Sequence, residues 1–379
     1  MAVGVIAEYN PFHNGHLYML KKIKEMYPDD TIILVLGGNF TQRGDVSIID
    51  KWTKTNIAKH YGIDLVIELP LIYSIQSADY FAKGALEILN SLKVNKLVFG
   101  SEINDIDLLK EIASVQLNNN ELDKLVKIYM RMGLNYPSSL SNAIYDITGK
   151  KVDTPNDLLG VSYMKEILKN DYNIEAVIIK RENNYHSKEI KEITSGEALR
   201  KALKEGKEIK CSVPEFTYKN LNNLHFMDEY FTLLKYKILT EKDLSKYHEV
   251  EEGIENKIKK EIINSSNYDE LINKVKSKRY TYNKIKRILL YILLDITKED
   301  MKEINNWNYI RILGFNEKGR KYLNKVKKDS GLKIISKFER NNKLLNLELK
   351  STIIYSIPHN EVNLIEKEYK NNLWKWKDI

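Results

Sequence analysis

The chain has 379 residues, of which 43% are hydrophobic and 30% charged, a composition typical of folded globular proteins and not of disordered or fibrous ones. This length exceeds what one compact core usually organises, so we expect two domains. The single cysteine, Cys211, excludes an internal disulfide and a cysteine-cluster metal site, and no apolar run reaches the roughly 18 residues of a membrane span.

Charge is distributed unevenly along the chain. Residues 1–200 contain 23 Lys and Arg against 26 Asp and Glu, a net charge of −3, whereas residues 201–379 contain 37 against 26, a net of +11. This asymmetry indicates a polyanionic partner, with a solvated lysine-rich helical surface as the alternative. The first residues resemble a strand and lack a charged segment followed by a long apolar one, so we expect a cytoplasmic protein with no membrane partner.

The first 200 residues alternate short apolar runs with amphipathic segments. Continuous apolar runs at 2–8, 31–37, 64–69, 95–100 and 175–180 predict buried strands of a parallel sheet. Helical patterns lie between them, at 15–26, about 50–60 and about 77–91. The pattern predicts an α/β fold with a Rossmann-like, doubly wound parallel sheet.

The sequence pattern changes after about residue 220. Long amphipathic stretches at 231–240 and 283–296 predict helices, and a smaller mixed segment follows at 309–338. We therefore expect an ATP-binding catalytic domain at 1–205 and a mostly helical, basic domain at 206–379.

Two histidines flank a tight turn after the first strand. The strand ends near Glu8, Asn14-Gly15 supplies the turn, and His16 lies at the start of a helix, whose unpaired amides and dipole favour an anion. Imidazoles at His13 and His16 could donate to one phosphate and gain charge as negative charge develops there. Ordinary turn histidines are the alternative. A zinc pair would need a third ligand, which is not evident.

The place of this turn favours the phosphate interpretation, because doubly wound sheets bind nucleotides beyond the first strand. HNGH (13–16) resembles the H-x-G-H signature of the nucleotidyltransferase superfamily.

Further stretches occur in order along the chain: GGNFTQRGD (37–45), DLVIELP (64–70), FGSE (99–102), TPNDLLGVSYMK (154–165), RENNYH (181–186), TSGEALR (194–200), SKRYTYNKIKRILL (277–290) and YIRILGFNEKGR (309–320). Together they resemble the bacterial tRNA(Met) cytidine acetate ligase family over nearly the whole chain.

The resemblance implies an ATP-dependent reaction. Acetate and ATP would give acetyl-adenylate and pyrophosphate, and the acetyl group would pass to N4 of the wobble cytidine, position 34, of elongator tRNA(Met). ATP is a substrate here, and Mg²⁺ would be its natural counter-ion, although no dedicated carboxylate cage is evident.

The resemblance also assigns residues to ATP. The expected ATP loop comprises Ile6, Ala7, Glu8, Tyr9, Asn10, Pro11, Phe12, His13, Asn14, Gly15, His16, Leu17, Tyr18 and Met19. Gly100, Asn156 and Arg181 match the remaining nucleotide contacts of the family. Without the resemblance, Gly100 could simply end a strand, Asn156 could cap a helix, and Arg181 could be a solvated strand end.

TSGEALR resembles the second phosphate motif of the superfamily. Ser195 and the following amides would hold the β- and γ-phosphates, and Arg200 would stabilise departing pyrophosphate, so the expected catalytic set is His13, His16, Ser195 and Arg200. Glu197 is expected to point outward. A capping box between Thr194 and Glu197 fits the same spacing, and both interpretations place a helix start here.

Other segments are candidates for acetate or tRNA. Gln42 and Arg43 follow the second strand and could bind the carboxylate or the tRNA, unless this is a plain connecting loop, and Glu68 is a further functional candidate. The basic, aromatic segment 274–287 is expected to hold tRNA phosphates and to stack a base. The tentative tRNA contacts are Lys278, Arg279, Tyr280, Tyr282 and Arg287.

Two other functions remain open. A small-molecule adenylyltransferase that makes a dinucleotide cofactor would need only the first domain, but it leaves the basic half unexplained. A non-catalytic RNA-binding protein would have little reason to keep both HNGH and TSGEALR.

Overall fold

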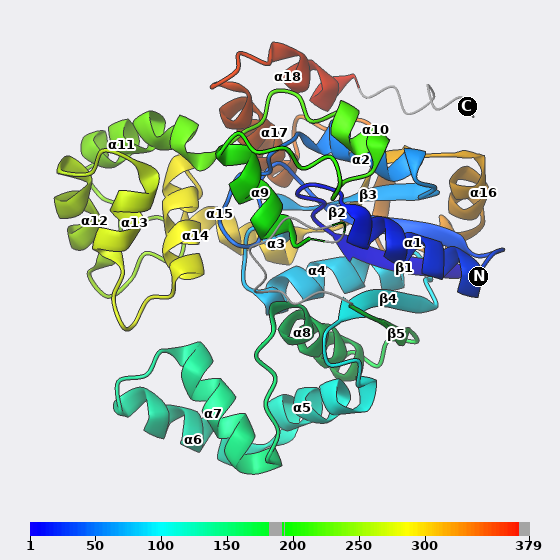
Figure 1. Cartoon of the computed structure of the whole chain (residues 1–379), viewed down its shortest axis with the longest axis horizontal. Helices are drawn as coiled ribbons and strands as arrows, with labels where there is room; N and C mark the ends of the chain where they lie inside the picture. The colour runs from blue at the N-terminus through cyan, green and yellow to red at the C-terminus, as the bar shows by residue number, and fades with distance from the viewer. Residues whose placement is uncertain (182–191, 193, 371–379) are drawn as a thin grey trace.

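The computed structural model describes residues 1–181, 192 and 194–370. Its centre is a seven-stranded sheet in the order β5-β4-β1-β2-β3-β6-β7, with helices on both sides (Figure 1). The strands are β1 (Ala2–Ala7), β2 (Thr31–Gly37), β3 (Leu65–Leu69), β4 (Lys96–Ser101), β5 (Glu175–Lys180), β6 (Tyr309–Phe315) and β7 (Lys333–Ile335). The five strands expected from the apolar runs are confirmed, because each is a continuous hydrophobic segment that suits a strand covered on both faces.

Strands β1 to β5 are mutually parallel. From β1 the chain adds β2 and β3 on one side and then crosses over to place β4 on the other. The direction of winding therefore reverses between β1 and β4. In a doubly wound sheet this reversal opens a crevice at the carboxyl ends of the two strands, and that is where ligands bind. The HNGH segment follows β1 after a short loop, and Gly100 is the penultimate residue of β4.

The helices of the sheet body are α1 (Asn14–Met26), α2 (Lys51–His60), α3 (Leu71–Ser74), α4 (Ala78–Ser91), α8 (Pro155–Lys169), α9 (Gly196–Lys204), α10 (Glu215–Lys219), α15 (Lys298–Lys302), η2 (Glu303–Asn306), α16 (Glu317–Val326), α17 (Lys343–Ser356) and α18 (Val362–Tyr369). The predictions for α1, α2 and α4 are confirmed to within a residue or so. An arm between β4 and α8 protrudes from the body and consists of α5 (Ile106–Asn118), α6 (Asn120–Arg131) and α7 (Tyr136–Thr148) (Figure 1).

A second group of helices projects beside the body, and we call it the helical module. It comprises η1 (Met227–Tyr230), α11 (Phe231–Thr240), α12 (Ile254–Ile263), α13 (Tyr268–Val275) and α14 (Tyr282–Leu293) (Figure 1). The described part of the chain contains no helix that is long and apolar enough to cross a lipid bilayer.

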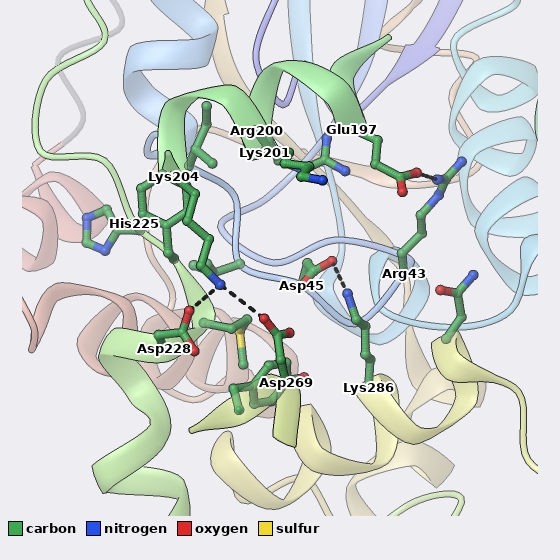
Figure 2. A pocket seen from close by; sticks show the side chains of 16 residues that line it. Arg43, Asp45, Glu197, Arg200, Lys201, Lys204, His225, Asp228, Asp269 and Lys286 are labelled. Carbon is green, nitrogen blue, oxygen red and sulfur yellow. Dashed lines mark hydrogen bonds and ion pairs between the residues drawn. The ribbon is translucent and has the colours of Figure 1, made fainter. Parts of the chain in front are cut away.

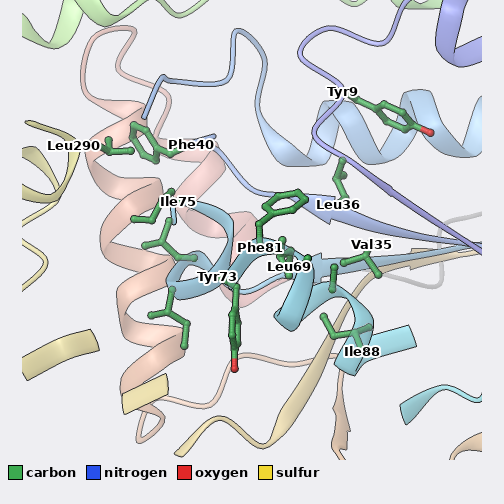
Figure 3. Close-up of a cluster of buried hydrophobic side chains, with 14 of the residues drawn as sticks. Tyr9, Val35, Leu36, Phe40, Leu69, Tyr73, Ile75, Phe81, Ile88 and Leu290 are labelled. Carbon is green, nitrogen blue, oxygen red and sulfur yellow. The ribbon is translucent and has the colours of Figure 1, made fainter. Parts of the chain in front are cut away.

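The expected division after residue 205 does not follow the sheet. Strand β6 pairs antiparallel with β3, and β7 extends the sheet beyond it, so the chain returns to the first sheet after the helical module. The module also shares the body's core: Leu290 of α14 lies in the same buried cluster as Phe40 and Ile75 (Figure 3). The short, mixed pattern of 309–338 does not predict this return to the sheet, because the residues of a strand do not indicate which other strand it pairs with.

A buried ion network fastens the C-terminal helices to the sheet. Lys51 Nζ lies 2.5 Å from Glu68 Oε1 and 2.7 Å from Glu368 Oε1, and Arg311 Nη1 lies 3.0 Å from Glu68 Oε2 and 2.7 Å from Glu368 Oε2. All four side chains are almost fully buried. Glu68, expected as a functional residue, thus serves to balance two buried cations.

Candidate active site

The two histidines close the first turn of α1 with their side chains. His13 is the N-cap: its Nδ1 accepts from the Gly15 amide at 3.1 Å, and His16 Nδ1 accepts from the His13 amide at 3.2 Å. The rings stack with centroids 3.7 Å apart and planes 21° apart. Because each Nδ1 is an acceptor, the neutral rings carry their protons on Nε2. Both imidazoles are therefore set as Nε2–H donors, the form that suits a phosphate oxygen.

Burial and neighbouring charge keep these rings neutral at rest. Burial, with the cations Arg181 and Arg200 nearby, lowers the pKa of His13 to about 3. Burial and the neighbouring His13 and Arg181 hold the pKa of His16 well below its usual range. A bound phosphate would raise the pKa of both rings again, because its negative charge favours the protonated form of an imidazole.

A second helix start meets the first. Ser195 is the N-cap of α9, and its Oγ accepts from the Ala198 amide at 3.3 Å. Arg200 Nη1 donates to the Asn10 carbonyl at 2.8 Å. A side-chain carbon at Gly196 would lie 3.2 Å from that carbonyl and 4.0 Å from the His13 ring, so glycine permits this close approach. The alternative capping box with Thr194 as N-cap is wrong, because the helix starts one residue later.

The nucleotide contacts assigned on β4, α8 and β5 lie together. Glu102 links them: its Oε1 accepts from Asn156 Nδ2 at 2.5 Å and lies 3.3 Å from Arg181 Nε. A side-chain carbon at Gly100 would lie 3.1 Å from Arg181 Cγ, so this glycine makes room for the arginine. Asn156 does not cap α8, whose N-cap is Thr154. Glu102 Oε2 is buried and has no hydrogen-bond partner in the part of the chain described, which makes it available to a ligand hydroxyl or amine.

The loop after β2 is fixed against the ATP loop. Glu8 Oε1 accepts from the Gln42 amide at 2.6 Å, and burial raises the pKa of this carboxyl group. Lys54 Nζ donates to the carbonyls of Gly37 and Gly38 at 2.8 and 2.6 Å. Burial lowers the pKa of Lys54 to about 7. The loop is thus held by two buried ionisable groups, more than a plain connection requires.

Inside the ATP loop, the aromatic residues shape the site. Tyr9 and Phe12 are buried and pack edge to face with ring centroids 4.8 Å apart, and both rings contact His16. Asn14 Nδ2 donates to the Cys211 carbonyl at 3.0 Å, and Asn10 Oδ1 accepts from the Ile48 amide at 2.9 Å. Gly15 is the second residue of α1, beside His16. Of the other predicted residues, Ile6, Ala7, Leu17, Tyr18 and Met19 are half-buried on β1 and α1, and Pro11 is buried.

A charged cleft of about 250 Å³ lies between α9, the loop after β2, and the helical module (Figure 2). Two bridges cross it: Lys204 pairs with Asp228 and Asp269, and Lys286 Nζ lies 2.8 Å from Asp45 Oδ2. The complete lining is Arg43, Asp45, Val46, Ile48, Glu197, Arg200, Lys201, Lys204, His225, Phe226, Met227, Asp228, Tyr268, Asp269, Asn283 and Lys286.

The cleft adjoins the histidine turn. Arg200 and Ile48 both line the cleft, and each forms a hydrogen bond with Asn10. Arg43 Nη1 lies 3.6 Å from Glu197 Oε2 at the cleft, and Glu197 points outward as expected, with 66% of its side chain exposed. The structure therefore brings HNGH, TSGEALR and the loop containing Arg43 to one edge of the sheet, beside the helical module.

The expected tRNA contacts on the helical module differ in exposure. Lys278, Arg279 and Tyr282 are exposed, and Tyr282 also bonds to Asn273. Tyr280 is buried and its hydroxyl donates to the Glu251 carbonyl at 2.8 Å, so little of its ring is left to stack on a base. Arg287 is mostly buried and pairs with Glu249 through Nε at 3.2 Å and Nη2 at 3.3 Å.

Sequence reasoning missed Glu102 and Lys54. Glu102 lies within the quoted stretch FGSE, but only the fold brings it to Asn156 and Arg181. Lys54 lies in the helical pattern of 50–60 and carries no local signal. Lys286 belongs to the basic segment 274–287, but its pairing with Asp45 could not be predicted. Of the stretch RENNYH, only Arg181 is within the described residues.

The comparisons with known proteins show the family and the fold of the chain. The family model described as HIGH Nucleotidyl Transferase matches residues 1–371. The tRNA(Met) cytidine acetate ligase of Clostridium acetobutylicum is 39% identical, over 97% of this chain and 98% of that protein. Among solved structures, apo Thermotoga maritima TmcAL is 31% identical with a TM-score of 0.89 and 98% of each chain covered.

The same Thermotoga protein bound to alpha-thio ATP is 32% identical with a TM-score of 0.86 and 96% of each chain covered. The family model, the curated relative and both solved structures thus each cover almost the whole chain. The chain belongs to the tRNA(Met) cytidine acetate ligase family, within the HIGH nucleotidyl transferases.

Proposed function

We propose that this protein is an ATP-dependent ligase that activates acetate as acetyl-adenylate and acetylates N4 of cytidine 34 in elongator tRNA(Met). The observation that carries the proposal is the convergence of His13, His16, Arg181 and Arg200 where the sheet changes its direction of winding, with the starts of α1 and α9 against one another. Four cationic or proton-donating side chains and two helix starts suit a triphosphate.

In the first step, an acetate oxygen attacks the α-phosphorus and pyrophosphate leaves. The Nε2–H groups of His13 and His16 donate to phosphate oxygens, and the phosphate charge raises the pKa of both rings, so that they can gain protons as negative charge develops. Arg200 and the amides after Ser195 stabilise the departing pyrophosphate. Gly100, Glu102, Asn156 and Arg181 form the wall for the nucleoside. Glu8 accepts from Gln42, and one oxygen of Glu102 accepts from Asn156 and pairs with Arg181. Mg²⁺ would arrive as ATP's own counter-ion.

In the second step, the cytidine N4 attacks the acetyl carbon. A C–N bond forms, the bond between the acetyl carbon and the phosphate oxygen breaks, AMP leaves, and N4 gives up a proton. The target base must leave the anticodon stack to reach the adenylate. The charged cleft offers it a place beside Arg43 and Arg200, with the exposed Lys278 and Arg279 outside to hold backbone phosphates.

One assay tests the proposal and separates it from its rivals. The protein is incubated with ATP, labelled acetate and total tRNA, and the label is located by nuclease digestion. Label in N4-acetylcytidine of tRNA(Met) is expected. ATP consumption that depends on a phosphorylated mononucleotide, without labelled tRNA, would point instead to a cofactor adenylyltransferase, and tRNA binding without turnover would point to a non-catalytic RNA-binding protein.

A further inference from the structure

A cluster of histidine and glutamate side chains joins the start of the helical module to the C-terminal helices. His225 and Glu229 lie at η1, and His359 and Glu361 lie in the turn between α17 and α18. One ligand atom from each of His225, Glu229 and His359 lies within 4.8 Å of the others. The His225 ring points away from the two lysine bridges of the charged cleft, so the proposed mechanism does not use it (Figure 2).

The hydrogen bonds of His225 require one proton more than a neutral imidazole and an ionised Glu361 carboxylate hold. Tyr230 Oη donates to the Tyr355 carbonyl at 2.8 Å, and that carbonyl can only accept. The 2.6 Å contact between His225 Nδ1 and Tyr230 Oη must therefore use the proton of the imidazole. His225 Nε2 is then a bare lone pair, yet it lies 2.9 Å from the carboxylate oxygen Oε2 of Glu361. Two acceptors this close require a positive charge on or between them.

The second histidine also faces a carboxylate. His359 Nε2 lies 3.1 Å from Glu229 Oε1, and this buried nitrogen makes no hydrogen bond of good geometry within the described chain. The two imidazoles pack edge to face with centroids 4.4 Å apart. Two positively charged rings this close would repel each other, whereas one cation between them would face both rings and both carboxylates.

We propose that His225, Glu229 and His359 bind a divalent transition-metal ion of the zinc class, with Glu361 as the fourth ligand. Neutral imidazole and carboxylate are ligands that zinc prefers, and two carboxylates balance its charge. The bond from His225 Nδ1–H to Tyr230 fixes the tautomer that presents Nε2 to the ion, as the outer partners of metal-binding histidines usually do. Small movements of the side chains would bring the ligand atoms around one centre.

Such an ion would cross-link two segments that are far apart in the sequence. It would join the segment at 225–229, where the chain enters the helical module, to the turn at 359–361 behind α17. The Asn223 amide already donates to Glu361 Oε1 at 3.2 Å, so the two segments are in contact without the metal. Because the ligands come together only in the folded chain, zinc would stabilise the folded state.

The test uses the full chain with Cys211→Ser, which removes the one exposed thiol as a competing ligand. After treatment with a chelator, the protein is titrated with Zn²⁺ by calorimetry, its melting temperature is followed with zinc, and Co²⁺ is added for its visible absorption bands. We expect one zinc per chain, a zinc-dependent rise in melting temperature, and the strong visible bands of four-coordinate cobalt. None of these three measurements depends on ATP or tRNA.

His359→Gln and Glu229→Gln should each weaken zinc binding at least tenfold and abolish the cobalt bands, while melting without metal stays close to that of the parent. His60→Gln, at an exposed histidine on α2 whose ring stacks on Phe216, is the matched control and should leave zinc binding and the cobalt bands unchanged. Zinc binding that is the same in parent and variants, or no binding at micromolar zinc, would overturn the proposal. The cluster would then hold an extra proton in place of the ion.

Discussion

The rings of His13 and His16 stack at 3.7 Å, and each accepts a backbone hydrogen bond at Nδ1 from the turn that carries the pair. The same contacts that start α1 therefore orient two Nε2–H groups toward a ligand. Fold and function share these side chains, because removing either ring takes away one cap and one donor.

We predict that His16→Ala lowers acetyl-adenylate formation by about 10²–10³-fold, the usual loss for one donor to a developing charge. Acetate-dependent exchange of pyrophosphate into ATP measures this step without tRNA. Affinity for tRNA should stay nearly intact, because the exposed Lys278 and Arg279 lie on the helical module. Loss of exchange and tRNA affinity together would mean that the two sites are not separate. His16→Asn keeps an acceptor for the His13 amide and distinguishes a lost cap from a lost phosphate contact.

The pKa shifts of these rings predict how stability depends on pH. The pKa of His13 is about 3 in the folded protein and near 6.5 in the unfolded chain, so between these values the unfolded chain binds the additional proton. Stability is therefore full above pH 6.5 and falls as the pH decreases, by at most about 1.4 kcal/mol per pH unit for each buried histidine. Urea unfolding at pH 7, 6 and 5 measures the slope. His13→Asn should make it shallower, and an unchanged slope would contradict the neutral pair.

Sequence and structure agree best where a pattern is local. HNGH, the five apolar strands and the start of α9 could be predicted because each depends on the chemistry of neighbouring residues. Contacts between distant segments could not: nothing near Glu102 indicates Arg181, and nothing near Glu68 indicates the cations at Lys51 and Arg311. The basic pattern of 274–287 indicated residues that could hold tRNA phosphates but did not show that Arg287 pairs with Glu249.

Gly44 should be essential for seating the helical module. Its φ is +77°, and a side-chain carbon there would lie 2.4 Å from the Arg287 amide nitrogen. Gly149 is a matched control with φ of +67° and nothing within 4 Å of the same position. Gly149→Ala should lower the free energy of unfolding by about 1–2 kcal/mol, the ordinary penalty of a non-glycine residue in the left-handed backbone conformation. Gly44→Ala should lower the free energy of unfolding by about 1–3 kcal/mol more than that, because the backbone at Arg287 must move. Urea unfolding measures both, and equal costs would show that the loop and α14 are not in close contact.

The buried ion network should be far more sensitive than the surface pairs. Arg311→Met removes one of two cations between Glu68 and Glu368, whose side chains are 2% and 0% exposed. Leaving two buried carboxylates with Lys51 as their one remaining cation should cost about 3–5 kcal/mol in the free energy of unfolding. Lys321→Met removes an exposed partner of Glu317 and should cost at most about 0.5 kcal/mol. Chemical denaturation of both variants at pH 7 gives the comparison. Similar losses would mean that the network contributes no more than a surface pair, and that α17 and α18 are held to the sheet by apolar packing.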